Sequence, residues 1–183
     1  MRALRLTMSV AEVRAKSAAI REWLVALPPF ASARVVLAYV SRGNEVMTHE
    51  LIQQLLAEGR RVGVPVFDAD RAEYHASLID EFPGDLVAGQ LQILEPRPEK
   101  VRRIGRDQFA AVLVPGVAFD PHGGRLGRGK GYYDRLLEGA PSVKIGLAYE
   151  FQIVEEVPVH EHDVPMDFII TETRIITCKR KSP

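Results

Sequence analysis

The segment VLVPGVAFDPHGGRLGRGKGYYDRLL, residues 112–137, decides the fold and carries most of the chemistry of this chain. It begins with an apolar run and continues into a loop in which glycine recurs at positions 127, 129 and 131. Glycine permits positive φ and lets backbone amides approach a ligand closely. The cations Arg125, Arg128 and Lys130 alternate with these glycines, and a helix-like segment follows. Because amides and cations at the start of a helix bind phosphate, the loop predicts a phosphate site.

Continuous apolar runs alternate with helical patterns on both sides of this segment. Ser9 and Glu12 form a capping-box pattern before a helix that ends at Pro28, and Thr48 is a candidate cap for a helix over residues 50–58. Strands that are apolar throughout are buried on both faces, which predicts an α/β domain whose mainly parallel sheet is flanked by helices on both faces. The strands are expected at residues 34–40, 62–67, 74–79, 110–115, 144–149 and 168–171, with an edge strand at 174–178.

The glycine loop follows directly after the expected strand at residues 110–115. In parallel α/β sheets, ligands bind beyond the carboxyl ends of the strands, so the loop lies where a ligand is expected. Residues 82–107 are rich in proline, glycine and charge. We interpret them as a long connection and a candidate lid.

The bulk properties exclude several classes of protein. A chain of 183 residues is typical of one domain, here residues 1–183, and a formal charge of zero argues against nucleic-acid or membrane partners. Cys178 is the only cysteine, which excludes an intrachain disulfide and favours a reducing, cytoplasmic setting. We find no apolar run of membrane-spanning length and no signal-peptide pattern, and we expect a monomer or a weak dimer.

Two common nucleotide-binding motifs fail in the glycine loop. The spacing of Gly124, Gly129 and Lys130 matches the start of a P-loop, but Gly131 stands where a hydroxyl would hold magnesium. A dinucleotide-binding fingerprint fails because Tyr132 replaces its third glycine. The remaining alternatives are an anion site and a flexible basic turn, and the alternating glycines and cations favour the anion site.

Any magnesium would therefore need carboxylate ligands, and Asp134 is the nearest. Of Tyr132 and Tyr133, one is expected to pack in the core and the other to meet a flat ligand. The residues alone do not say which. His160 and His162 have the spacing of a zinc pair, but no third ligand accompanies them, which favours surface histidines.

The block resembles that of the 5-formyltetrahydrofolate cyclo-ligase family, also called methenyltetrahydrofolate synthetases. The family pattern reads approximately PGxxFD, a short gap, then G-x-RLG-x-G-x-GYYD. This chain matches it at Pro115, Gly116, Phe119, Asp120, Gly123 and residues 125–134. The resemblance continues over essentially the whole chain, through residues 2–5, 39–48, 93–96, 146–152 and 162–171. The chain departs from the family at Arg2, Met47 and Gln92, where lysine, aspartate and glycine are usual.

The resemblance implies a folate enzyme of one-carbon metabolism with an architecture related to the NagB/RpiA/CoA-transferase-like folds. Such an enzyme uses ATP and Mg²⁺ to cyclise 5-formyltetrahydrofolate, with or without a polyglutamate tail, to 5,10-methenyltetrahydrofolate. ADP and phosphate are released, and the intermediate is a phosphorylated formyl group, an imidate phosphate.

The resemblance also implies roles for individual residues. Glu45 and Tyr133 would contact the folate, and Asp134 and Asp163 would hold magnesium. The implied catalytic residues are Lys130, Arg125 and Tyr133. The implied ATP contacts are Arg2, Arg5, Arg125, Leu126, Gly127, Arg128, Gly129, Lys130, Gly131, Tyr132 and Tyr133.

A second function remains open at this point. A non-catalytic nucleotide- or phosphosugar-binding module on a similar α/β sheet would need the glycine loop but not the separate carboxylates. The joint presence of Lys130 with Glu45, Asp134 and Asp163 favours the ligase. An RNA-binding protein would show a wide basic face, and the zero net charge argues against it.

Overall fold

A mixed β-sheet forms the centre of the computed structural model, which describes the chain except for residues 70, 90–92, 130, 161 and 180–183 and the side chain of Arg2. Among the residues described, eight strands join in the order β12-β11-β10-β7-β1-β2-β3-β6. Their bounds are β1 Val35–Leu37, β2 Arg61–Asp68, β3 Glu73–Ile79, β6 Arg102–Ile104, β7 Ala111–Pro115, β10 Val143–Leu147, β11 Phe168–Ile170 and β12 Ile175–Thr177.

The middle of the sheet is parallel and its edges are antiparallel. Strands β11, β10, β7, β1 and β2 pair in parallel, one after the other. Strand β12 pairs antiparallel with β11, and β3 pairs antiparallel with β2 and β6. The predicted mainly parallel sheet is thereby confirmed, and so is the edge strand predicted at residues 174–178.

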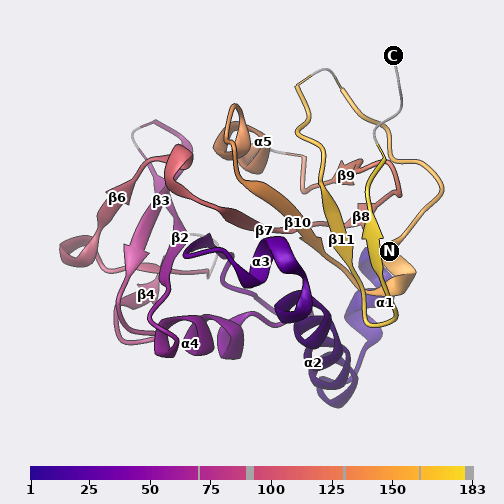
Figure 1. The fold of residues 1–183 in the computed structure, drawn as a ribbon, viewed down its shortest axis with the longest axis horizontal. Helices are drawn as coiled ribbons and strands as arrows, with labels where there is room; N and C mark the ends of the chain where they lie inside the picture. Colours follow the sequence, from indigo (N-terminus) through magenta and orange to yellow (C-terminus); the bar gives the residue numbers. More distant parts are fainter. Residues whose placement is uncertain (70, 90–92, 130, 161, 180–183) are drawn as a thin grey trace.

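Helices cover both faces of the sheet (Figure 1). Along β7, Ala111 and Leu113 belong to one core cluster, whereas Val112 and Val114 belong to another. This alternation follows from the period of two residues in a strand. The first cluster packs against α2 Val10–Ala26, α3 Pro28–Ala31 and α4 His49–Ala57, and the second against α5 Tyr132–Leu137. The short helix α1 Arg2–Thr7 precedes α2.

The predicted capping box is present at the start of α2. The Ser9 hydroxyl accepts a hydrogen bond from the Glu12 amide at 3.2 Å, and the Glu12 carboxylate accepts one from the Ser9 amide at 2.8 Å. Each side chain thus satisfies an amide that has no partner within the helix.

Helix α4 begins after Thr48 as expected, but the predicted side-chain cap is wrong. The Thr48 hydroxyl donates to the carbonyl of Tyr39 at 2.6 Å and accepts from the amide of Ser41 at 3.1 Å. Tertiary contacts therefore take the hydroxyl away from its own helix. These bonds hold the segment between β1 and α4, in which Glu45 lies.

Residues 82–107, which we interpreted as a long connection, contain strands and short helical turns, so that expectation is corrected. They contain the hairpin of β4 Leu86–Ala88 and β5 Leu94–Pro96, the short helical turn Pro98–Lys100, and β6, which completes the main sheet. Strands β5 and β6 contain charged residues, and β4 is an isolated apolar run of three residues, which is why the pattern did not predict them. A lid function for this segment stays a prediction.

Two strands too short to predict open the glycine loop. Strand β8 Ala118–Phe119 pairs with β9 Arg125–Leu126 as a small separate ladder. No helix in the described part of the chain is both long and apolar enough to cross a bilayer. The cytoplasmic location and the monomeric or weakly dimeric state stay predictions.

Candidate active site

A cavity of about 630 Å³ opens beyond the carboxyl ends of the central strands. Tyr39 and Val40 follow β1, and Gly116 and Val117 follow β7, so the two neighbouring strands deliver their next residues to the same wall. This is where a parallel α/β sheet is expected to bind its ligand. The other walls come from α1, β2, β3, β5, α5, the glycine loop, the segment of Glu45, and Pro158, His160 and Asp163.

The structure brings together nearly all the site residues that the sequence indicated. Lys130 lies outside the described residues, and so does the side chain of Arg2. All the others border the cavity: Arg5, Glu45, Arg125, Leu126, Gly127, Arg128, Gly129, Gly131, Tyr132, Tyr133, Asp134 and Asp163.

Asp120 fixes the start of the glycine loop. Its buried carboxylate accepts hydrogen bonds from the amides of His122 and Gly124 at 2.8 and 3.0 Å, and from the amide of Val157 at 2.8 Å. A carboxylate that receives several amide protons holds a turn firmly because each bond is charge-assisted. Asp120 thereby joins the loop to the segment that leads to Asp163.

The far end of the loop depends on glycine conformations. Gly129 and Gly131 have φ values of +79° and +59°, and Gly131 is the residue that precedes the first turn of α5. Residues with a Cβ rarely adopt this left-handed region. A side chain at either position would therefore strain the path by which the loop enters α5.

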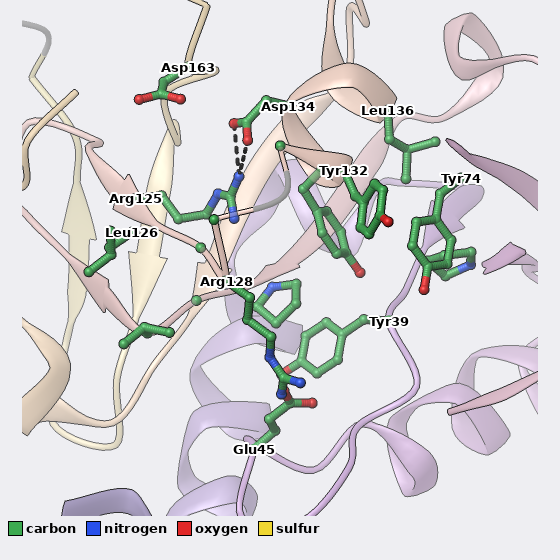
Figure 2. Close-up of a pocket in the computed structure, with 18 of the residues that line it drawn as sticks. Tyr39, Glu45, Tyr74, Arg125, Leu126, Arg128, Tyr132, Asp134, Leu136 and Asp163 are labelled. Carbon is green, nitrogen blue, oxygen red and sulfur yellow. Dashed lines mark hydrogen bonds and ion pairs between the residues drawn. The ribbon is translucent and has the colours of Figure 1, made fainter. Parts of the chain in front are cut away.

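An ion pair between Arg125 and Asp134 joins the glycine loop to α5 (Figure 2). The Nη2 atom of Arg125 donates to both carboxylate oxygens of Asp134, at 2.8 and 2.9 Å. The Arg125 side chain is 5% exposed, and its Cζ lies 5.7 Å from the centre of the Tyr133 ring. A Cβ on Gly127 would lie 2.8 Å from Nη1 of the same guanidinium. The cation expected at phosphate and the carboxylate expected at metal thus neutralise each other here.

Arg128 and Glu45 form a second ion pair at the cavity, which Figure 2 shows beside Tyr39. Nη2 of Arg128 lies 2.6 Å from Oε1 of Glu45, while Oε2 of Glu45 accepts from the amide of Arg42 at 3.0 Å. The two partners are separated by 83 residues in the sequence. The sequence analysis gave Arg128 to ATP and Glu45 to the folate, and did not predict that the two side chains are in contact.

Both tyrosines of the loop border the cavity, and one of the two also packs against the core, as expected. Tyr132 meets Tyr74 edge-on with ring centres 5.0 Å apart, and Cζ of Arg135 lies 5.1 Å from the Tyr132 ring. Tyr133 packs against both core clusters and also lines the cavity. Burial raises the pKa of the Tyr133 phenol far above its ordinary value, so the hydroxyl stays protonated.

Asp134 and Asp163 are the two expected magnesium ligands, and both border the cavity. The residues that the structure describes contain no cluster of three or more acidic, histidine or cysteine side chains. Two carboxylates are nevertheless enough for Mg²⁺, which commonly takes one or two of them and completes its shell with water and substrate phosphates. Asp163 also accepts the His160 amide at 2.8 Å, a bond that leaves lone pairs available. The donor set therefore fits magnesium.

Several residues at the cavity, or directly behind its wall, were missed as site residues. Gln152 lies behind the wall, where its amide donates to the carbonyls of Gly116 and Val117 at 3.0 and 3.1 Å. Tyr39 lines the cavity directly after β1, a position that the strand pattern could have indicated. Tyr74 also lines it, but the antiparallel pairing of β3 brings it there, and the sequence carries no signal for that pairing.

Known proteins share both the sequence and the fold. The 5-formyltetrahydrofolate cyclo-ligase family matches residues 1–172. A 5-formyltetrahydrofolate cyclo-ligase of Mycolicibacterium smegmatis is 36% identical over 166 residues, which are 88% of this chain and 84% of that protein. The Escherichia coli K12 protein of the same name is 33% identical over 155 residues, 83% of this chain and 85% of that protein. The solved structure of Aquifex aeolicus 5,10-methenyltetrahydrofolate synthetase superposes with a TM-score of 0.84 at 32% identity, covering 98% of this chain and 89% of that chain.

The fold and the cavity define an α/β protein with a cavity at the carboxyl edge of a mainly parallel sheet. With these matches, the chain belongs to the 5-formyltetrahydrofolate cyclo-ligase family and is a ligase of that class.

Proposed function

We propose that the protein joins ATP hydrolysis to the cyclisation of 5-formyltetrahydrofolate, giving 5,10-methenyltetrahydrofolate, ADP and phosphate. The observation that carries the proposal is one cavity bordered by the glycine loop, by Glu45 and by the ring of Tyr133. Phosphate-binding and folate-binding groups therefore face the same space, in a chain whose family is named for this reaction.

In the proposed first step, the formyl oxygen attacks the γ-phosphorus of ATP and ADP leaves. The new C–O–P link turns a poor leaving group into phosphate, and the product is an imidate phosphate. Catalysis of such a transfer is mostly positioning and charge neutralisation. The loop amides with Arg128 and Lys130 would supply both, because glycines and cations alternate in this part of the sequence.

In the proposed second step, N10 of the folate attacks the formyl carbon. A C–N bond forms, N10 loses its proton, and the C–O bond to phosphate breaks. Glu45 would hold the pterin by accepting its N–H groups, since its carboxylate is already oriented by the amide of Arg42. Tyr133 would abut the folate with its ring, because the residue lines the cavity.

Arg125 takes a positioning role in this proposal. Its guanidinium is buried and donates to Asp134, so it orients the carboxylate and the first turn of α5. Magnesium, when bound by Asp134 and Asp163, would neutralise phosphate charge.

A direct assay tests the function. The protein is mixed with 5-formyltetrahydrofolate, Mg²⁺ and ATP, and 5,10-methenyltetrahydrofolate is followed by its near-ultraviolet absorbance. We expect product only with ATP, and one ADP for each turnover. Nucleotide binding without any product would instead favour the non-catalytic binding module.

A lysine substitution tests the phosphate site. Lys130→Ala should raise the KM for ATP about tenfold, or about 1.4 kcal/mol, because it removes a charge-assisted contact. The matched control is Lys179→Ala, at an exposed position outside the cavity. Equal ATP kinetics in the two variants would show that Lys130 does not contact phosphate.

A further inference from the structure

The ion pair between Arg128 and Glu45 joins two groups that the proposed function gives to different substrates. Arg128 belongs to the phosphate loop, whereas Glu45 belongs to the segment between β1 and α4. Their charged atoms lie 2.6 Å apart, so each is the other's partner. A phosphate and a pterin would each compete for one half of this pair.

The two partners differ in how firmly they are held. The Glu45 side chain is 10% exposed, and a backbone amide fixes its second oxygen. The Arg128 side chain is 49% exposed. Arg128 lies in the glycine loop, and the next residue, Gly129, has a φ of +79°. A long, half-exposed side chain can change rotamer at little cost, whereas the glutamate is fixed by its segment. Arg128 is therefore the partner that moves.

We propose that this ion pair couples the two substrate sites, an inference that rests on the proposed function. Nucleotide binding draws the Arg128 guanidinium to phosphate, which leaves the Glu45 carboxylate ready to accept the N–H groups of the pterin. Folate binding satisfies Glu45 and so weakens its hold on Arg128. The first substrate to bind breaks the ion pair, at a cost in free energy. The second substrate binds without that cost, so each binds more tightly when the other is present. Linkage requires the two effects to be equal in size.

A static arrangement makes the opposite prediction. If Arg128 bridged Glu45 and a phosphate at the same time, Glu45 would orient the arginine for the nucleotide. Removing the Glu45 charge would then weaken nucleotide binding. The direction in which removal of the Glu45 charge changes nucleotide affinity therefore separates a coupling role from a merely structural one.

Calorimetric titration of a non-hydrolysable magnesium–ATP analogue, without folate, measures this direction. Glu45→Gln keeps an acceptor for the Arg42 amide but loses the charge that holds Arg128. We expect the variant to bind the analogue about two- to fivefold more tightly than the wild type, the range of a partly exposed ion pair. Glu50→Gln is the matched control, because it breaks the ion pair with Arg21 outside the cavity. It should leave the affinity unchanged.

The reciprocal variant keeps the test independent of the folding of Glu45→Gln. Arg128→Gln should bind 5-formyltetrahydrofolate about two- to fivefold more tightly than the wild type when no nucleotide is present. In the wild type, saturating 5-formyltetrahydrofolate should increase the affinity for the ATP analogue by a similar factor. This increase should vanish in Arg128→Gln. Unchanged or weaker single-ligand binding in folded variants would overturn the coupling. Turnover by the wild type is measured separately, so a failure of the proposed reaction is distinguishable.

Discussion

Arg125 and Asp134, nine residues apart, are joined by two hydrogen bonds of 2.8 and 2.9 Å that close the glycine loop into a ring. The guanidinium is buried, and the carboxylate lies in the first turn of α5. Breaking a buried pair from one side leaves an uncompensated charge. The loop shape and the proposed metal site therefore depend on the same contact.

Asp134→Asn should separate stability from metal binding. The amide keeps the shape but loses the charge opposite Arg125, so the free energy of unfolding should fall by about 1.5–3 kcal/mol. Urea denaturation measures this loss, and a magnesium titration of activity should show a higher requirement. Asp163→Asn, which can still accept the His160 amide, should raise the magnesium requirement with a stability change within about 0.5 kcal/mol. An unaltered magnesium requirement in both variants would remove these residues from the metal site.

Gly127→Ala should act through the guanidinium of Arg125. Its Cβ would lie 2.8 Å from Nη1, so the guanidinium must shift away from Asp134. We expect a loss of about 1–3 kcal/mol in stability and a higher KM for ATP. Gly129→Ala meets open space but has a φ of +79°, so its penalty of about 1 kcal/mol comes from the backbone. Crystal structures of both variants should show Arg125 displaced only in Gly127→Ala; displacement in neither would contradict this account.

Tyr133→Phe tests whether the hydroxyl takes part in the reaction. The phenol stays protonated because burial raises its pKa far above the ordinary value, and its ring packs against Arg125. We expect kcat and the KM for folate to stay within about threefold, which is less than 1 kcal/mol. Tyr133→Ala, which removes the ring, should lower kcat/KM strongly. A large loss of kcat in Tyr133→Phe would assign a chemical role to the hydroxyl.

Glu95→Gln should change how stability depends on pH. Burial raises the pKa of the Glu95 carboxyl, although the amide of Phe67 donates to it and partly opposes the shift. The folded state thus holds this proton more tightly than the unfolded chain. Its contribution to stability is full below the unfolded pKa and is lost as pH rises through the folded pKa. From about pH 4 to pH 7, wild-type stability should therefore decline relative to Glu95→Gln.

Urea denaturation at several pH values measures this difference. The substitution Glu95→Gln is not expected to disturb the fold, because the oxygen of the new amide can still accept the Phe67 amide. Parallel stability curves for the two proteins would show that Glu95 does not titrate in this range.

Local signals predicted the parts of the fold that local interactions determine. The capping box at Ser9 was readable because both partners lie within one turn. The central strands were readable because burial on both faces makes them apolar throughout. The glycine loop could be predicted because positive φ favours glycine, and glycine stands at positions 129 and 131.

The features that the sequence did not predict depend on contacts between distant segments. The Thr48 hydroxyl bonds to Tyr39 and Ser41 because the segment after β1 lies beside the start of α4, which no local pattern records. Likewise, the cations of the loop looked available for phosphate, yet Arg125 is held by Asp134 and Arg128 by Glu45. Which charge neutralises which is decided only when the chain is folded.

The cavity combines residues from Arg5 near the start of the chain to Asp163 near its end. During synthesis, which proceeds from the N-terminus, the glycine loop is made well before the segment that carries Asp163. A nascent chain that lacks this segment has an incomplete wall, whatever its other parts have folded into. The cavity is therefore complete only after this late segment has been made and has folded against the rest.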